Sequence, residues 1–274
     1  MKGIILAAGY AKRLYPLTRN FPKPLLDVDG KPIIDHVLAS MESIGVNDVY
    51  VVTNARFEER FKAWAKDKNV TLLSDGSTSE GDKLGAIGDI SYAISKIGID
   101  DDILVIGGDS ILTFAIDGAF KKFRESNENL ILAYDLKSSE AAKSFGVIEM
   151  DGSGKVLSFE EKPENPRSTL CSTCAYFYPR KTLPLIKQYL EEGNNPDTPG
   201  SFVQYLLAKK IPVLCMSFDK PWFDIGTVEK LEGAREHFSK ARRFLNDIAK
   251  KDAASKKQAA ARQAGGKRQG RPHF

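Results

Sequence analysis

Short apolar runs and segments with helical spacing alternate along the first 140 residues of the chain. Continuous apolar runs at residues 3–7, 49–53 and 103–106 predict buried strands. Further strand-like runs cover residues 70–73 and 130–136, and helical spacing covers residues 33–44, 57–64 and 84–97. This alternation predicts an α/β fold with a mostly parallel sheet and helices on both of its faces.

The pattern changes after residue 140. Strand-like runs at residues 147–150 and 156–159 flank the sequence Asp-Gly-Ser-Gly, which predicts a hairpin. Further strands are expected at residues 175–178 and 213–217, and a helix at residues 182–192. We therefore expect one continuous domain over residues 1–238, whose second half (141–238) is more antiparallel than its first half (1–140).

A long helix is expected from residue 228 towards residue 250. Its apolar positions follow a seven-residue repeat: Leu231, Ala234, Phe238, Ala241, Leu245 and Ile248. Packing on the body is favoured over a self-associating seam, with a homo-oligomer as the alternative. Residues 239–252 are thus predicted to be a helical extension. Residues 253–274 lack the apolar residues needed to fold and are predicted to be a basic disordered tail.

Charge is distributed unevenly along the chain. The formal net charge is +4, but residues 239–274 hold 11 Lys or Arg and 2 Asp, a net of +9, which leaves −5 for residues 1–238. The body is therefore not expected to bind nucleic acid, while an anion- or RNA-binding tail is a minor alternative to a solvated one. No apolar run reaches the roughly 20 residues of a membrane-spanning helix and no signal peptide is evident, so a cytoplasmic location is expected.

The chain has three cysteines, Cys171, Cys174 and Cys215. The first two form a Cys-x-x-Cys, but no second such pair and no His cluster accompanies them. Small apolar residues in a strand are therefore favoured over a redox or metal site.

Candidate chemistry follows the first predicted strand. Small residues there allow a ligand to approach the backbone closely, free N–H groups in such turns bind anions, and Lys and Arg add positive charge. The sequence thus predicts a triphosphate site. The sequence of this loop matches neither the G-x-G-x-x-G dinucleotide motif nor the G-x-x-x-x-G-K-[ST] P-loop. The small and basic residues are Ala7, Ala8, Gly9, Lys12, Arg13, Arg19 and Lys23.

Four further segments accompany this loop in order along the chain. The loop reads LAAGYAKRLYPLT at residues 6–18, with PKPL at 22–25. The others are VIGGD at 105–109, FGVI at 145–148, EEKP at 160–163 and WFDIGT at 222–227. Together they resemble the motifs of the sugar-1-phosphate nucleotidyltransferase family, whose members include glucose-1-phosphate thymidylyltransferases.

The resemblance implies a Rossmann-like α/β fold, with the second half on the acceptor side, and a role for each matching residue. Arg13, Lys23 and Asp109 would be catalytic, and Asp109 and Asp224 would share Mg²⁺. The sugar phosphate would be held by Gly146, Glu161, Lys162 and Thr173. The nucleotide would be bound by Leu6, Ala8, Gly9, Arg13 and Asp109. Lys12 beside the triphosphate, and Asp75 and Gly85 near the base, are further nucleotide-binding candidates from their own chemistry. The chemistry agrees, because two carboxylates with Mg²⁺, together with Arg and Lys, can neutralise two phosphorylated substrates.

Several of these residues also have a purely structural interpretation. Asp109 could be a turn residue, Asp224 a helix cap and Arg13 a solvated side chain. Glu161 and Lys162 could form a surface ion pair. Functional roles are favoured because the motifs are intact and because Asp109 follows a parallel strand at its carboxyl end.

The chain departs from the family pattern at three places. Ala11 and Lys12 replace the usual Gly and Thr or Ser, and Ala11 restricts the backbone. Residues 74–76 replace a Gln-containing segment that reads the base; Asp75 there could accept from a cytosine amino group, although UTP or dTTP together are favoured over CTP. Cys174 occupies a position where Gly is common in the family, and its side chain narrows the space for the sugar.

The expected activity is Mg²⁺-dependent transfer of a nucleotidyl group from an NTP to a sugar 1-phosphate, which releases pyrophosphate and forms an NDP-sugar. Two alternatives stay open. One is a catalytically weak relative that binds NDP-sugars, and the other is cytidylyl transfer to a phosphorylated alcohol.

Overall fold

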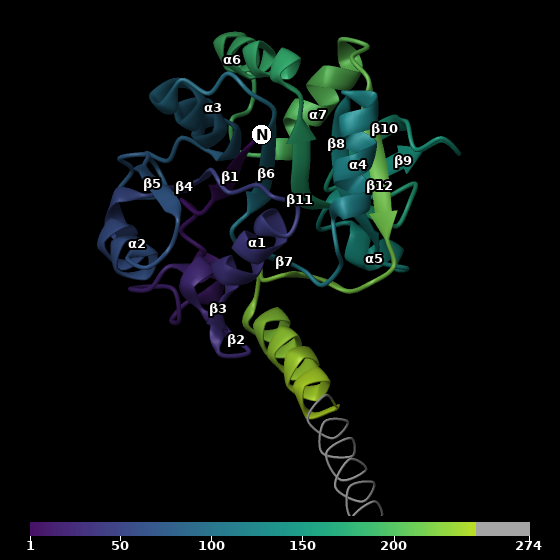
Figure 1. Cartoon of the computed structure of the whole chain (residues 1–274). Helices are drawn as coiled ribbons and strands as arrows, with labels where there is room; N and C mark the ends of the chain where they lie inside the picture. Colours follow the sequence, from purple (N-terminus) through teal and green to yellow (C-terminus); the bar gives the residue numbers. More distant parts are fainter. Residues whose placement is uncertain (245–274) are drawn as a thin grey trace, which may run out of the picture.

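A nine-stranded sheet forms the centre of the part of the chain that the computed structural model describes, residues 1–244 (Figure 1). Four strands of the first half lie in the order β6-β1-β4-β5 and are parallel to one another. Their bounds are β1 (Lys2–Leu6), β4 (Val49–Thr53), β5 (Val70–Ser74) and β6 (Ile103–Gly107). The predicted parallel strands are confirmed, and the carboxyl ends of β1 and β6 lie side by side.

The sheet changes direction at β11 (Leu170–Tyr178). This strand runs antiparallel to β6 and pairs in the same sense with β8 (Asn129–Asp135) and β9 (Gly146–Met150). The hairpin of β9 and β10 (Val156–Glu161) is present as predicted, and β12 (Val213–Phe218) runs parallel to β8. The second half is therefore the more antiparallel one, and β11 joins it to the first.

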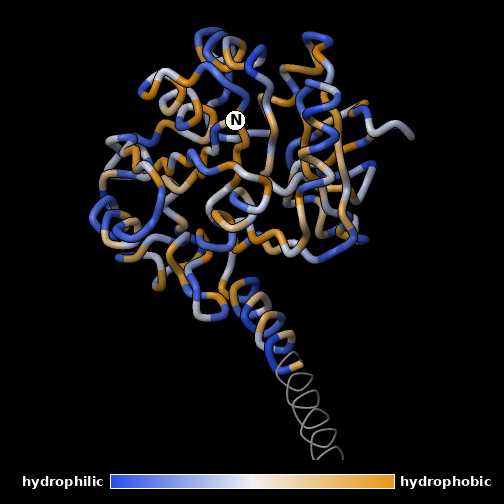
Figure 2. Tube along the Cα trace, in the orientation of Figure 1, coloured by the Kyte–Doolittle hydropathy of each residue, from blue (hydrophilic) through white to orange (hydrophobic). Residues whose placement is uncertain are grey.

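Helices cover both faces of the sheet because strand side chains alternate between two hydrophobic layers. Ile4 and Val105 contribute to the layer that contains α3, α6 and α7. Ile5 and Ile106 contribute to the layer that contains α1, α2 and α4. Figure 2 shows hydrophobic positions along the central strands and mixed positions on the outer helices. The helices are α1 (Ile33–Glu42), α2 (Glu58–Ala65), α3 (Ala86–Ile97), α4 (Asp117–Ser126), α5 (Ser139–Ala142), α6 (Leu183–Glu191) and α7 (Pro199–Ala208).

Several elements were not predicted from the sequence. Helices α4, α5 and α7 are three of them. Two small antiparallel sheets are the others: β2 (Asp27–Val28) pairs with β3 (Lys31–Pro32), and β7 (Ser110–Leu112) pairs with β13 (Trp222–Asp224). The pair of β7 and β13 matters for function, because it joins the two segments that carry the candidate metal ligands.

The chain is helical from residue 228 to residue 244, and this helix extends away from the body (Figure 1). Leu231 and Ala234 are fully buried against the body, so the predicted packing is confirmed for the first turns. Beyond them, Phe244 is 66% exposed. The rest of the predicted extension to residue 252 and the predicted tail at 253–274 lie outside the described residues. Within the described part of the chain, no helix combines the length and apolar character needed to cross a membrane.

Candidate active site

Two cavities lie next to each other, and the first of them is at the carboxyl ends of β1 and β6. The first, of about 280 Å³, is lined by Leu6, Ala8, Gly9, Gly85 and Asp109 among others. We call it the nucleotide-side cavity. The second, of about 130 Å³, is lined by Gly146, Glu161, Ser172 and Asp224 among others, and we call it the acceptor-side cavity. Cys174 and Pro199 line both cavities, so the two meet there.

The two glycines before Asp109 are required by crowding. A side-chain Cβ on Gly108 would lie 2.9 Å from the Leu6 carbonyl oxygen, and the Gly108 N–H donates to that oxygen at 2.8 Å. A Cβ on Gly107 would lie 3.0 Å from Asp109 Oδ1 and 3.1 Å from Cys174 Sγ. The chain after β6 can therefore lie against the end of β1 only without side chains, and this places Asp109 in the nucleotide-side cavity.

The small sheet of β7 and β13 brings the two candidate metal ligands together. Asp224 pairs with Ser110, the residue after Asp109, and the Ile225 N–H donates to the Asp109 carbonyl oxygen at 3.1 Å. Each carboxylate also has a cationic partner: Lys23 pairs with Asp109, and Lys230 Nζ lies 2.8 Å from Asp224 Oδ2. Asp109 lines the nucleotide-side cavity and Asp224 the acceptor-side cavity.

These two carboxylates fit Mg²⁺. Hard oxygen donors suit this ion, which is usually bound by one or two carboxylates while substrate phosphates and water complete its shell. Among the described residues no group of three or more His, Cys, Asp or Glu side chains is arranged to hold a metal by itself. A site that needs the substrate phosphates to complete it agrees with this arrangement.

The basic loop after β1 is held by its own turn. Lys12 and Arg13 are exposed in a 3₁₀ turn, and Leu14 inserts into the core behind them. Arg13 Nη2 is 4.0 Å from the position of a Cβ on Gly226, two residues after Asp224. Arg13 and Lys23 thus reach the region of the two aspartates, whereas neither they nor Lys12 line the cavity walls.

Ala11 adopts the left-handed conformation, with φ of 47° and ψ of 43°, where the family pattern has Gly. A residue with a Cβ is strained in this region, and Gly is not. Ala11→Gly is therefore expected to raise the free energy of unfolding by about 1 kcal/mol, as measured by denaturant titration. The matched control is Ala241→Gly, at an exposed position of the C-terminal helix, which should lower it by about 1 kcal/mol. Destabilisation by both variants would contradict the assignment of strain to Ala11.

Glu161 is the central polar group of the acceptor-side cavity. Its carboxylate lies between Gly146 and Gly200, and a Cβ on Gly146 would come within 3.2 Å of Glu161 Oε2. Burial raises the pKa of Glu161, and the nearby Lys162 opposes this shift. Lys162 itself is exposed, with its Nζ 3.9 Å from Glu161 Oε1, and does not line the cavity.

Thr173 lies elsewhere than the resemblance implies. Its side chain is fully buried, and its hydroxyl donates to the Leu132 carbonyl oxygen at 2.9 Å. The residues on either side, Ser172 and Cys174, line the acceptor-side cavity instead. Cys174 has φ of 57°, the conformation that the more common Gly adopts easily.

The cysteines are all free thiols. Burial is the first cause that raises the pKa of Cys174, and the carboxylates of Asp109 and Asp224 add to it. The thiol therefore stays protonated beside the two aspartates. This agrees with the interpretation of Cys171 and Cys174 as apolar residues of a strand, here β11.

On the base side, the structure separates two residues predicted together. Gly85 lines the nucleotide-side cavity, but Asp75 does not. The Asp75 carboxylate at the end of β5 accepts hydrogen bonds from the Ser77 N–H at 2.8 Å and from the Ser77 hydroxyl. Asp89, which the sequence did not single out, lines this cavity. An aspartate one helical turn after a glycine, on an otherwise apolar helix face, was the available signal.

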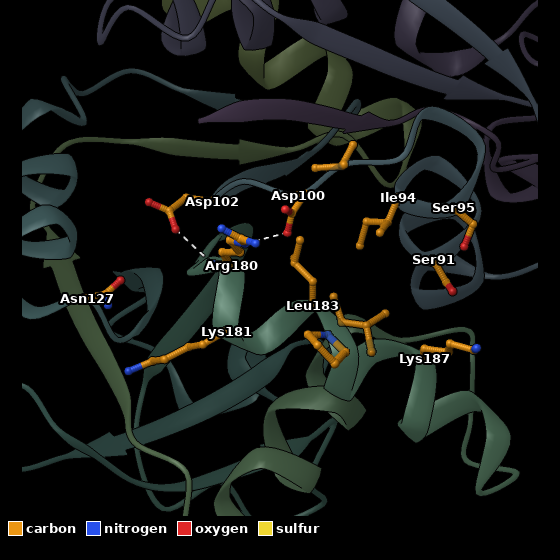
Figure 3. Close-up of a pocket in the computed structure, with 13 residues that line it drawn as sticks. Ser91, Ile94, Ser95, Asp100, Asp102, Asn127, Arg180, Lys181, Leu183 and Lys187 are labelled. Carbon is orange, nitrogen blue, oxygen red and sulfur yellow. Dashed lines mark hydrogen bonds and ion pairs between the residues drawn. The ribbon is translucent and has the colours of Figure 1, made fainter.

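A larger cavity of about 750 Å³ lies between α3 and α6 (Figure 3). It lies near the amino end of β6, away from the strand ends that carry Asp109. Its charged groups satisfy one another: Arg180 Nε is 2.5 Å from Asp100 Oδ1, and the Arg180 N–H donates to Asp102 Oδ1 at 2.9 Å. This cavity contains none of the predicted site residues.

Known proteins resemble this chain along most of its length. Residues 2–241 match the family model for nucleotidyl transferases. The chain is 30% identical over 256 residues to a glucose-1-phosphate thymidylyltransferase of Neisseria meningitidis serogroup A, covering 85% of this chain and 81% of that protein. It is 27% identical over 240 residues to a UTP–glucose-1-phosphate uridylyltransferase of Synechocystis sp., covering 83% of this chain but only 61% of that protein.

A solved structure shows the same fold. It is the complex with sucrose of a Bacillus anthracis protein assigned as a glucose-1-phosphate thymidylyltransferase. Its TM-score is 0.74 at 24% identity, with 86% of this chain and 94% of that chain covered. The match to the family model spans both cavities and every motif that the sequence shares with the family. The chain therefore belongs to the nucleotidyl transferase family.

Proposed function

We propose that the protein transfers a nucleotidyl group from an NTP to a sugar 1-phosphate, with Mg²⁺, and so forms an NDP-sugar and pyrophosphate. The observation that carries this proposal is the junction of the two cavities. One cavity opens on Asp109 and the other on Asp224, and Lys23, Arg13 and Lys230 lie beside these carboxylates. Such a junction suits a reaction between two phosphorylated substrates.

Different residues of the chain bind and neutralise different parts of the two substrates. A phosphate oxygen of the sugar phosphate forms a bond to the α-phosphorus of the NTP while the bond to the leaving pyrophosphate breaks. Lys23 and Arg13 neutralise the triphosphate, and Glu161 accepts hydrogen bonds from sugar hydroxyl groups. Positioning and charge neutralisation supply most of the catalysis in such reactions. Mg²⁺, held by Asp109 and Asp224, would add positive charge at the reacting phosphates.

Two relatives support the substrate class, because their names specify glucose 1-phosphate together with UTP or thymidine nucleotides. For this chain, UTP or dTTP with a sugar 1-phosphate is the corresponding proposal. The acceptor-side cavity is small, and Cys174 narrows it, so the preferred sugar can differ from glucose.

The test is pyrophosphate release from UTP, dTTP, CTP and GTP against a panel of sugar 1-phosphates with Mg²⁺. We expect release that requires both substrates and that stops on addition of a chelator. If pyrophosphate is released only with CTP and a phosphorylated alcohol such as phosphocholine, the acceptor substrate is that alcohol and not a sugar 1-phosphate. Measurable binding of NDP-sugars without any release would show a catalytically weak binding protein.

A further inference from the structure

Asp89 is a buried carboxyl on the wall of the nucleotide-side cavity. It lies in the first turn of α3, where its backbone N–H donates to the Gly85 carbonyl oxygen at 2.7 Å. The residue is only 5% exposed, and its Oδ1 has no hydrogen-bond partner within residues 1–244. A buried polar atom without a partner is unfavourable, and native proteins rarely keep one. A ligand in this cavity is the natural partner.

The charged groups around Asp89 come from three other segments. Asp75 lies at the end of β5, Asp197 precedes α7, and Lys83 precedes α3. Burial first, and then the nearby carboxylates of Asp75 and Asp197, raise the pKa of Asp89 to about 8 against the opposing effect of Lys83. At neutral pH the group is therefore mainly a neutral carboxylic acid, which offers an O–H donor beside a C=O acceptor.

The other carboxylates on this wall, Asp109 and Asp197, already pair with the cations Lys23 and Lys83. Lys83 lines the same cavity, with its Nζ 3.0 Å from Asp197 Oδ2. Helix α3 begins at Ala86, which also lines the cavity, so the positive end of the helix dipole lies there. Donors suit carbonyl oxygens of a ligand and disfavour amino groups. The Asp89 carboxyl thus lies beside donors on this wall, while the other two carboxylates are already paired.

This pattern is complementary to an imide. The pairing edge of uracil or thymine has one N–H between two carbonyl oxygens, whereas cytosine carries an amino group on that edge. A carboxylic acid can accept from the imide N–H while its own O–H donates to an adjacent carbonyl oxygen.

Building on the nucleotidyl transfer proposed above, we propose that Asp89 recognises the base of the NTP, pairing as a neutral acid with the imide edge of uracil or thymine. Asp89 then acts as a specificity residue for UTP or dTTP, and Asp75 does not. It lines the nucleotide-side cavity only, so the sugar phosphate is not its partner.

The proposal has a consequence for pH dependence. A carboxyl with a raised pKa in the folded protein is protonated below that value and becomes a carboxylate above it, when the donor is lost. Affinity for UTP should therefore fall as pH rises through about 8. Asn at this position keeps a donor and an acceptor at every pH.

The test measures dissociation constants for UTP with MgCl₂ by calorimetry, at pH 6.5 and pH 8.5. For the unaltered protein, Kd should rise about threefold between the two pH values. Asp89→Asn should bind UTP nearly as well at pH 6.5 and lose this pH dependence. Asp89→Ala should raise Kd about 10- to 100-fold at pH 6.5. Equal Kd values for all three proteins, or the same pH dependence in Asp89→Asn, would overturn the proposal.

Altered nucleotides identify the group that Asp89 contacts. The triphosphate of 3-methyluridine lacks the imide N–H, so it should bind weakly to the unaltered protein. Asp89→Ala should weaken the binding of this nucleotide little further. Deoxyuridine triphosphate should show the same loss in Asp89→Ala as UTP does. If Asp89→Ala binds deoxyuridine triphosphate as tightly as the unaltered protein does, Asp89 contacts the ribose 2′-hydroxyl and the base assignment is wrong. Tighter binding of CTP than of UTP would also overturn it.

Glu128→Gln is the matched control. Glu128 also has a buried oxygen without a partner, Oε2, but it lies before β8, pairs with Lys181 and does not line the nucleotide-side cavity. This variant should bind UTP with the unaltered pH dependence. Pyrophosphate release by the unaltered protein is measured in parallel. Its absence would contradict the proposed function, whereas release combined with unchanged Asp89 variants would contradict only the assignment of Asp89.

Discussion

Asp109→Asn is expected to reduce pyrophosphate release by about 10³-fold or more while leaving the fold intact. The substitution removes the negative charge that pairs with Lys23 and that we propose holds Mg²⁺, but it keeps the size of the side chain. The loss should appear in kcat, because charge neutralisation at the reacting phosphates is stronger in the transition state than in the ground state. Initial rates at saturating NTP and sugar phosphate, together with a thermal melt, measure both parts of this expectation.

Asp219→Asn controls for the loss of one carboxylate in general. Asp219 is an exposed aspartate that follows β12 and lines neither candidate cavity. Its variant should keep full activity. Substantial turnover by Asp109→Asn, or an equal loss in both variants, would show that Asp109 is not the metal ligand.

Gly146→Ala is expected to raise KM for the sugar phosphate at least about tenfold and to leave the Kd of the NTP within about twofold. The added methyl group would overlap the Phe159 ring, with Cε1 only 2.8 Å away, and would press on the Glu161 carboxylate. Both side chains line the acceptor-side cavity and neither lines the nucleotide-side cavity. Separate titrations of the two substrates therefore test whether the cavities are assigned to the correct substrates.

Gly152→Ala is the corresponding control, because a Cβ at Gly152 in the β9–β10 turn would meet no atom within 4 Å. It should change neither substrate constant. An effect of Gly146→Ala on NTP binding alone would reverse the assignment of the cavities. A melting temperature lowered equally by both variants would instead indicate a general sensitivity of the hairpin.

Local sequence patterns were sufficient for the parts of the fold that have regular periodicity. The parallel strands have continuous apolar runs, and Gly107 and Gly108 mark the end of β6. Helix α7 was missed because it is apolar on several sides, with Phe202, Val203 and Leu206 all buried, so it shows no clear amphipathic stripe. The pair of β7 and β13 was missed because two three-residue strands about 110 residues apart leave no local pattern.

The site was predicted best where motifs follow strands and least well where the backbone is irregular. Asp109 and Asp224 are brought together as the motifs suggested. On β11, however, the register with β8 shifts between Ser172 and Tyr176, and Cys174 has a positive φ. Such a bulge changes which side chains face the cavity. The alternation of side chains between the two faces of a strand therefore could not predict on which face of β11 the Thr173 side chain lies. Asp89 was missed because its only signal in the sequence is a single aspartate on an otherwise apolar helix face, and its importance depends on burial.

The direction change at β11 has a consequence for how the substrates meet. The half of β11 near Tyr178 bonds to β6 and β8, and the half near Cys171 bonds to β8 and β9. The two halves of the protein therefore share one continuous hydrogen-bond ladder, and a hinge motion between them would have to break it. We expect the distance between the bound NTP and the sugar phosphate to be fixed by the strand itself. Changes in access to the site would then be local movements of loops, and small-angle scattering should show no change in overall dimensions when both substrates bind.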